Sequence, residues 1–444
     1  MAASIGCITS TWKTAKSFMD WDTNSGPPKQ LVVNGNLISK SIDIANSMNT
    51  FFIEKVKHIR QGIPNVKNSF EKCREKMNDK RCRLSMSHVS VHLVRKMLKN
   101  LKSSKSTSID GLDNFSIRIS AEIIAEPLHH VICLSILLNK FPSEWKLSKV
   151  IPLHKKGSKD ERNNYRPVAI LSPLSKILER IIHQQVYKYF SQNKIFHQNL
   201  HGYRSNRSTL TALISMYDRW LRASSRGEIS GAVLLDLSAA FDLVEPPILI
   251  EKLRIYGLEE DFITWIDIYF EERYQGVWIG HVLSDLIRCD IGVPQGSILG
   301  PLLFLIYFND LPDHLQCKTD SYADDTTLST SNSKIAEIGQ TLTEDCSNVS
   351  EWMKSNRLKL NATKTHVLVL GTQQRLARTQ ESLNVKMDGL ELKEDPEKCE
   401  LLLGCKIQSN LKCHMQVAFV IAKVSHRLTA LMNSKFVLPF ALLK

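Results

Sequence analysis

The strongest constraint on how this chain can fold comes from two acidic segments that are far apart in the sequence. Asp236 lies near the end of the apolar, strand-like run 231–237. Because burial of an unpaired carboxylate is costly, Asp236 is expected at the edge of a sheet, facing a cleft. Asp324 and Asp325 are adjacent in a predicted tight turn between strands, and two neighbouring anions repel each other unless a cation offsets them.

The rest of the chain alternates irregularly between helical and strand-like patterns, which favours an α+β fold. Residues 384–392 contain Asp388 followed by Gly389, a type I′ turn signal, and predict a hairpin. Pro246 and Pro247 predict the start of a helix that Gly257 ends. Other predicted helices cover 44–59, 91–101, 174–182 and 210–221, with Ser208 capping the last, and the predicted strands are 231–237, 275–279, 286–290 and 366–370.

Composition indicates an ordinary folded protein with a basic surface. The 444 residues are 43% hydrophobic and 23% charged, and this length suggests two to three lobes at roughly 150 residues per domain. Lys and Arg number 58 against 45 Asp and Glu, a net charge of +13 that would attract a polyanion such as nucleic acid. Charge alone does not establish this function, since many basic proteins bind no nucleic acid.

The cysteines and the apolar runs indicate the cellular compartment of the protein. Ten cysteines are scattered without a secreted-scaffold pattern and no signal-peptide core is present, so an intracellular compartment is expected, either cytoplasm or nucleus. No membrane span is expected, because the apolar runs are far shorter than the roughly 18 residues required. Most of the cysteines are expected to be plain thiols. An alternative is a zinc site near the C-terminal end of the sequence, formed by Cys399, Cys405, Cys413 and His414, although the gaps between them do not match the short paired spacing of zinc ligands.

The acids suit one particular reaction. A solvated turn is the ordinary interpretation of an isolated Asp-Asp pair, but a strand-end Asp, a second turn with paired Asp and a long basic segment together meet the needs of nucleotidyl transfer. Two Mg²⁺ ions about 3.5 to 4 Å apart can activate a primer 3′-hydroxyl and stabilise the leaving pyrophosphate. Serine hydrolase chemistry is disfavoured, because the sequence has no Gly-x-Ser-x-Gly nucleophile elbow.

Residues 85 to 410 resemble the reverse transcriptases of non-LTR (LINE-type) retrotransposons. The matching motifs appear in the order found in that family. They are the segments 151–157 (IPLHKKG), 164–167 (NYRP), 201–204 (HGYR), 234–242 (LLDLSAAFD), 292–297 (GVPQGS), 322–325 (YADD) and 360–365 (LNATKT).

The resemblance implies the metal ligands and a nucleotide contact. Asp236, Asp324 and the backbone of Leu237 would bind two Mg²⁺ ions, with Mn²⁺ as an alternative, and Asp325 would complete the acidic cluster at a more peripheral position. Phe241 matches a bulky aromatic beneath the incoming sugar. Such a ring would collide with a ribose 2′-hydroxyl and so favour deoxynucleotides, whereas the plainer interpretation of Phe241 is ordinary core.

Further contacts are implied along the basic and loop segments. A solvated loop is the plain interpretation of the basic run 146–166. In the family it is the fingers segment over the triphosphate, so Lys155 and Arg166 are the expected phosphate contacts, with Lys156 a close competitor of Lys155.

Two loops and a hairpin complete the implied site. Gln295 and Gly296 would line the nucleotide and template site, where glycine permits close backbone approach. Lys364 would act near the leaving pyrophosphate, although a plain surface lysine is an equal alternative. Leu403 and Gly404 resemble the hairpin that supports the primer end, the primer grip.

These matches imply a right-hand polymerase with fingers and palm over residues 85–410 and a truncated thumb beginning at 411–444. Residues 1–84 are expected to be an extension linking to a missing upstream domain. The implied function is an RNA-directed DNA polymerase that uses an RNA template, a DNA primer and dNTPs. The alternative is an inactive or repurposed nucleic-acid-binding remnant of such an element.

Overall fold

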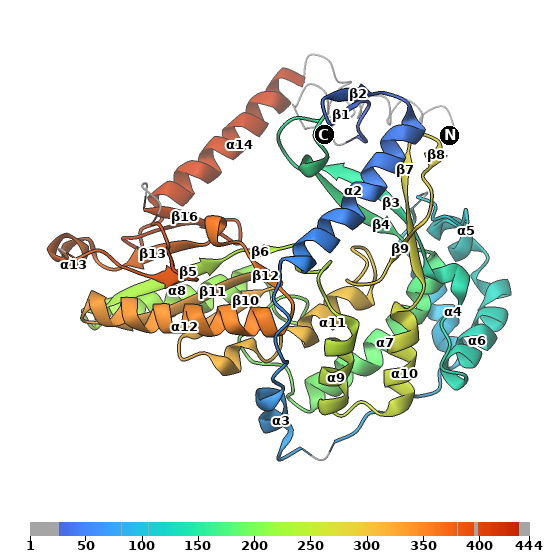
Figure 1. The fold of residues 1–444 in the computed structure, drawn as a ribbon, viewed down its shortest axis with the longest axis horizontal. Helices are drawn as coiled ribbons and strands as arrows, with labels where there is room; N and C mark the ends of the chain where they lie inside the picture. The colour runs from blue at the N-terminus through green and yellow to red at the C-terminus, as the bar shows by residue number, and fades with distance from the viewer. Residues whose placement is uncertain (1–25, 81, 105, 380, 395–397, 435–444) are drawn as a thin grey trace.

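The computed structural model describes residues 26–434 except 81, 105, 380 and 395–397 (Figure 1). Helices and strands are mixed, as the predicted α+β class requires. The helices are α2 (Ser41–Gln61), α3 (Glu71–Met77), α4 (Val91–Lys99), α5 (Asn114–Ile119), α6 (Ala121–Leu137), α7 (Pro173–Gln192), α8 (Thr209–Ser225), α9 (Pro246–Ile255), α10 (Glu260–Phe270), α11 (Leu299–Tyr307), α12 (Ile335–Ser355), α13 (Gln373–Arg378) and α14 (His414–Ser434). Within the described ranges, no helix has the length and apolar character needed to cross a membrane.

The strands form two larger sheets and several short pairs. They are β1 (Leu31–Val33), β2 (Asn36–Ile38), β3 (Leu147–His154), β4 (Tyr165–Ile170), β5 (Ile229–Leu235), β6 (Leu237–Ser238), β7 (Arg273–Ile279), β8 (Val282–Leu283), β9 (Ile287–Cys289), β10 (Lys318–Tyr322), β11 (Asp325–Asn332), β12 (Lys359–Leu360), β13 (His366–Leu370), β14 (Lys386–Met387), β15 (Leu390–Glu391), β16 (Cys399–Leu402) and β17 (Cys405–Gln408).

The first large sheet has four antiparallel strands in the order β10-β11-β5-β13. Successive side chains of β5 point to opposite faces, so Val233 joins the core shared with α12 and Ala232 the core shared with α8. Gly231 permits close packing of α12, because a Cβ at that position would lie 2.4 Å from the side chain of Ile338. One helix therefore covers each face, and the strand ends stay open.

The second sheet follows the order β4-β3-β7-β8, with β9 also paired to β7. The strands β3 and β7 run parallel, and the other pairs are antiparallel. Helix α2 lies across this sheet (Figure 1). Its side chains Met48 and Phe52 are buried in a common core with residues of β3, β4 and β7. Asn49 of α2 is buried and its side-chain amide donates to the backbone oxygens of Gln275 and Asp285, at 3.2 and 2.8 Å. These bonds fix α2 across β7.

Several predicted elements are confirmed. The helix over 44–59 is α2, and the run 366–370 is β13. Ser208 caps α8 through a reciprocal pair of hydrogen bonds with Thr211. The predicted hairpin forms between β14 and β15, with positive φ at both Asp388 and Gly389 as a type I′ turn requires.

A buried ion pair ties the helical layer together. Lys252 of α9 donates 2.6 Å hydrogen bonds to an Asp310 carboxylate oxygen and to the backbone oxygen of Tyr307, and both charged side chains are fully buried. The indole of Trp352 in α12 donates to the other Asp310 oxygen at 3.0 Å. Burial alone would raise the pKa of Asp310, but Lys252 and these hydrogen bonds lower it far below its usual range.

We expect Asp310→Ala to lower the free energy of unfolding by about 3–5 kcal/mol, because it leaves the Lys252 ammonium buried without its partner. Urea denaturation measures the change. Asp313→Ala is the control, since Asp313 pairs with Lys76 in a partly exposed position and should cost about 1 kcal/mol or less. Equal losses from the two substitutions would contradict this account. The double variant Lys252→Met/Asp310→Leu should recover most of the stability.

Candidate active site

The two acidic segments meet because β5 and β11 are antiparallel neighbours. Leu235 pairs with Thr326, so Asp236 and Asp325, one step further along each strand, occupy facing positions. Adjacent strands lie about 4.8 Å apart, well within the reach of a shared ion. Ala323, with φ of 60°, and Asp324 form the two-residue turn between β10 and β11.

The three acids destabilise one another in their ionised forms. Burial raises the pKa of Asp324, and the neighbouring Asp236 carboxylate raises it further, partly opposed by Arg166. The pKa of Asp325 is also raised by partial loss of hydration at its carboxyl, although the residue as a whole is exposed, and Asp324 and Asp236 add to the shift. A cation held among these groups would offset the repulsion.

The turn that carries Asp324 is held from behind by residues 199–202. The backbone N–H of Ser321 donates to the oxygen of Asn199 at 3.0 Å, and the N–H of His201 donates back to Ser321 at 2.7 Å. Gly202 lies so close that a Cβ there would be 2.3 Å from the backbone nitrogen of Ala323. Any larger residue at 202 would therefore displace the turn.

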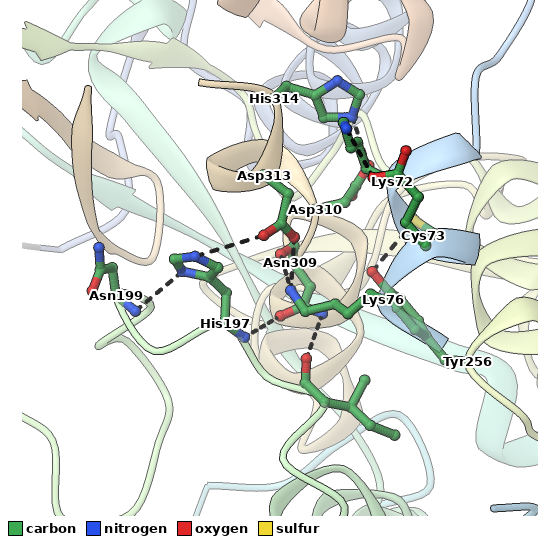
Figure 2. A network of polar contacts seen from close by, with 12 residues as sticks. Lys72, Cys73, Lys76, His197, Asn199, Tyr256, Asn309, Asp310, Asp313 and His314 are labelled. Carbon is green, nitrogen blue, oxygen red and sulfur yellow. Dashed lines mark hydrogen bonds and ion pairs between the residues drawn. The ribbon is translucent and has the colours of Figure 1, made fainter. Parts of the chain in front are cut away.

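A polar network anchors this supporting segment in the helical layer (Figure 2). The Asn309 side chain accepts from the backbone N–H of His197 at 2.7 Å and donates to the oxygen of Ile195 at 3.1 Å. The His197 ring then accepts from the backbone N–H of Asn199 at 3.2 Å. The position of the acidic turn thus depends on contacts from well outside the sheet.

Asp236 is held on its other side by the segment after β12. The backbone N–H of Asn361 donates to the oxygen of Asp236 at 2.9 Å, and the Thr365 hydroxyl accepts from the N–H of Asp236 at 3.4 Å. The same segment brings the Lys364 ammonium within 3.9 Å of an Asp236 carboxylate oxygen. The Asp236 and Lys364 side chains remain 38% and 69% exposed, so both are available to a ligand.

A cavity of about 1020 Å³ opens in front of these acids. Most of the residues that the sequence singled out line it, although they come from segments far apart in the chain. Those lining residues are Lys155, Arg166, Asp236, Leu237, Phe241, Gln295, Gly296, Asp324 and Lys364. Lys156 is not among the lining residues, which favours Lys155 of the two candidate lysines.

Aromatic packing and one buried polar contact shape the cavity floor. Phe241 is half-buried and stacks on Phe304 of α11 with ring centres 4.6 Å apart, and Tyr203 approaches its edge at 6.0 Å. Phe241 is thus partly core and partly a cavity surface. The Gln295 amide donates to both oxygens of Asp242, at 2.8 and 2.9 Å, and burial raises the pKa of Asp242 to about 6.

Gly296 lets this loop lie directly against β4. Its φ is +138°, and a Cβ there would lie 2.1 Å from the backbone oxygen of Ala169. The backbone oxygen of Gln295 accepts from the N–H of Ala169 at 2.8 Å. The 294–297 loop is therefore locked onto the sheet that carries Lys155 and Arg166.

Three predicted site residues lie outside the cavity lining. Asp325 is exposed and does not line the cavity. Leu403 and Gly404 form the turn of the β16–β17 hairpin with φ of 48° and 85°. That hairpin packs through Leu402 on the same core as α8.

Sequence reasoning missed the contact of Asp242 with Gln295 and the place of α2 at the cavity. Lys55 and Arg60 of this helix line the cavity, yet residues 1–84 showed no recognisable chemistry. The helical pattern itself was visible in the sequence. Nothing local indicated that it packs on β7, more than 200 residues away.

The donor set fits Mg²⁺ completed by a substrate. Mg²⁺ prefers one or two carboxylates together with substrate phosphates, and Asp236 and Asp324 offer hard oxygen ligands of this kind. Across the described part of the chain, no three His, Cys, Asp or Glu side chains are arranged to hold a metal ion by themselves. The zinc alternative at Cys399, Cys405, Cys413 and His414 is therefore not supported.

Comparison with known proteins gives the family of the chain. A family model described as reverse transcriptase (RNA-dependent DNA polymerase) matches residues 153–407, more than half of the sequence. The chain belongs to the reverse transcriptase family. The motifs that carried the resemblance fall almost entirely within the matched region.

Its relatives confirm the similarity to non-LTR retrotransposon polymerases. The chain is 29% identical to a probable RNA-directed DNA polymerase from transposon BS of Drosophila melanogaster, over 64% of this chain and 32% of that protein. It is 28% identical to the RNA-directed DNA polymerase from mobile element jockey of the same organism, over 63% and 32%. A putative 115 kDa protein in the type-1 retrotransposable element R1DM, also from D. melanogaster, is 27% identical over 63% and 27%. The aligned region thus spans 27% to 32% of the length of these relatives.

The repulsion among the acids predicts an effect of metal on stability. The pKa of Asp324 is higher in the folded than in the unfolded state, where it is about 3.9. The folded protein therefore loses stability as the pH rises from about 3.9 through the folded-state pKa. At pH 7.5 in EDTA, Asp324→Asn should therefore raise Tm by roughly 1–3 °C, because one of the repelling charges is gone. Adding MgCl₂ should raise the Tm of the wild type more than that of the variant.

The control is Asp267→Asn, which removes an exposed carboxylate from α10. Differential scanning fluorimetry with and without MgCl₂ measures all three proteins. If Asp324→Asn were less stable than the wild type in EDTA, repulsion among the acids could not be the dominant effect.

Proposed function

We propose that this chain is the polymerase part of a non-LTR retrotransposon protein and acts as an RNA-directed DNA polymerase. It would add dNTPs to a primer 3′-hydroxyl on an RNA template. One observation carries the proposal. The β5–β11 register brings Asp236 next to Asp324 and Asp325 at the edge of a cavity that Lys155 and Arg166 also line.

In this proposal the fold is a right-hand polymerase. The sheet β10-β11-β5-β13 with α8 and α12 is the palm, the β3–β4 hairpin belongs to the fingers, and α14 begins the thumb. Residues 85–410 are fingers and palm, and 411–444 are the start of the thumb. Leu403 and Gly404 are the primer-grip turn.

The acids would hold two Mg²⁺ ions, or Mn²⁺ in their place, which supply activation of the 3′-hydroxyl and charge stabilisation at the leaving pyrophosphate. Asp236, Asp324 and the backbone oxygen of Leu237 are the proposed ligands, with Asp325 supporting them. Leu237 pairs with Leu360, Asp236 directly follows the last paired residue of β5, and Asp324 lies in the turn that joins β10 to β11. The site is therefore organised before substrate arrives.

The remaining lining residues act on the nucleotide. Lys155 and Arg166 would bind the triphosphate, where the Arg fork suits two phosphate oxygens. Lys364, beside Asp236, would stabilise charge on the leaving pyrophosphate and is the nearest candidate to protonate it. Gln295 and Gly296 would contact the base and sugar from the opposite wall.

We expect Asp324→Asn to reduce Mg²⁺-dependent primer extension on an RNA template by roughly 100-fold or more, because a metal ligand is lost. Asp267→Asn should keep wild-type activity. Incorporation of labelled dNTP on RNA and DNA templates measures both. Wild-type extension by the Asp324 variant would refute the proposal. Salt-dependent RNA binding without incorporation by the wild type would instead support a nucleic-acid-binding remnant.

Phe241 is proposed to exclude ribonucleotides. Its ring is held on Phe304 and cannot move aside for a 2′-hydroxyl without losing that stacking. Phe241→Ala should lower the dNTP over rNTP ratio of kcat/KM by about 10-fold or more. Single-nucleotide incorporation kinetics measure the ratio. Phe115→Ala, at an exposed position on α5, should leave it unchanged, and an unchanged ratio in Phe241→Ala would exclude this role.

A further inference from the structure

The cavity carries more positive charge than its own acids balance. Eight Lys and Arg side chains and four Asp side chains line it. Part of this excess comes from α2, a helix that lies wholly before the region matched by the family model. A surplus of cations on one concave surface attracts anions from solution.

Lys55 of α2 joins the proposed phosphate-binding lysines at one wall. The pKa of Lys155 is lowered by burial and by the nearby cations Arg166, Lys55 and Lys364. The pKa of Lys55 is likewise lowered by burial, and Lys364 lowers it further. Cations from three separate segments therefore lie close enough to repel one another.

The acid nearest to these cations is already engaged. Asp242 attracts both Lys55 and Lys155, yet its two oxygens accept the hydrogen bonds of the Gln295 amide. One carboxylate in that position offsets only part of the charge of the surrounding cations. An anion with several charges would relieve the remaining repulsion.

Lys55 is presented from a rigid position. Its ammonium donates to the side chain of Asn163 at 3.3 Å, and so links α2 to the loop between β3 and β4. Arg162 of that loop lies over the ring of Phe51, 4.9 Å from its centre, and donates to the Ser47 hydroxyl at 3.3 Å. The helix and the loop with Lys155 are therefore joined, and little side-chain freedom is left to lose on binding.

We propose that Lys55 binds the triphosphate of the incoming nucleotide together with Lys155 and Arg166. The segment before the family-matched region would thereby complete the nucleotide site. This inference rests on the proposed function for the identity of the anion. Within α2, the triphosphate is favoured over a template phosphate because Lys55 bonds to Asn163, in the loop between Lys155 and Arg166, whereas Lys57 and Arg60 are exposed.

Steady-state primer extension tests the assignment. Lys55→Met should raise KM for dNTP by about 10-fold while kcat changes less than about twofold, because a charge-assisted contact to the substrate is lost. Lys55→Arg keeps a cation and should restore most of the affinity. Lys334→Met is the control. Lys334 is an exposed residue just before α12, and it pairs with Glu337 in the first turn of that helix. Unchanged KM in Lys55→Met, or an effect on template affinity alone, would overturn the inference and leave the polymerase assignment intact.

A second measurement does not need catalysis. Inorganic tripolyphosphate, added without primer or template, should raise the Tm of the wild type and of Lys334→Met, and should raise that of Lys55→Met less. If the wild type incorporates no dNTP but shows this Lys55-dependent stabilisation, the anion site stands and the polymerase function fails. Equal stabilisation of all three proteins would overturn the role of Lys55. Lys55→Gln replaces Lys55→Met if the latter does not fold.

Discussion

The antiparallel pairing of β5 with β11 is the interaction on which the site depends. Because Leu235 faces Thr326, the acids at the two strand ends reach the same edge of the sheet. Side chains alternate between faces along a strand, so a register shift of one residue would turn Val233 out of the α12 core and carry Asp236 out of line with Asp325. Packing of α12 on one face and α8 on the other therefore fixes the chemistry as well as the core.

That arrangement has a cost in stability. The pKa values of Asp324 and Asp325 are both raised by loss of hydration and by the Asp236 carboxylate, and Asp324 adds to the shift of Asp325. The folded state therefore holds charges that would separate if the turn were free to move. The turn is kept in place by Ser321, which is bonded on both sides to the 199–201 segment, and by the Asn309 contacts behind it. An unfavourable interaction at the site that is offset by contacts elsewhere in the fold is typical of functional sites.

Local signals in the sequence predicted a large part of this structure. The strand before Asp236, the turn at Asp324, the Ser208 cap and the hairpin at Asp388 each depend on residues within a few positions of one another, and each forms. Asp325, which was predicted in the same turn as Asp324, instead begins β11. The strands within the basic run 146–166 are harder to predict, because a lysine at a buried position of β3 hides the alternation of apolar and polar residues that marks a strand. Lys149 in that strand is buried with its ammonium over the Trp278 ring at 3.9 Å, a contact that spans the two sheet strands β3 and β7. The position of α2 follows from the hydrogen bonds of Asn49 to residues 226 and 236 positions away, and no local pattern encodes such a pairing.

The acids and the cations that line the cavity come from different sheets, and this separation is relevant to both proposals. Asp236 and Asp324 lie at the end of the sheet β10-β11-β5-β13, whereas Lys55, Lys155 and Arg166 come from the second sheet and from helix α2, which covers it. A polyphosphate with bound divalent cations carries both kinds of complementary charge, so it would relieve repulsion on both walls at once. Lys364, beside Asp236 yet coupled to Lys55 and Lys155, lies where the two walls meet. The proposed metal-bound nucleotide would meet the acids and the cations together because the residues of both sheets line one cavity.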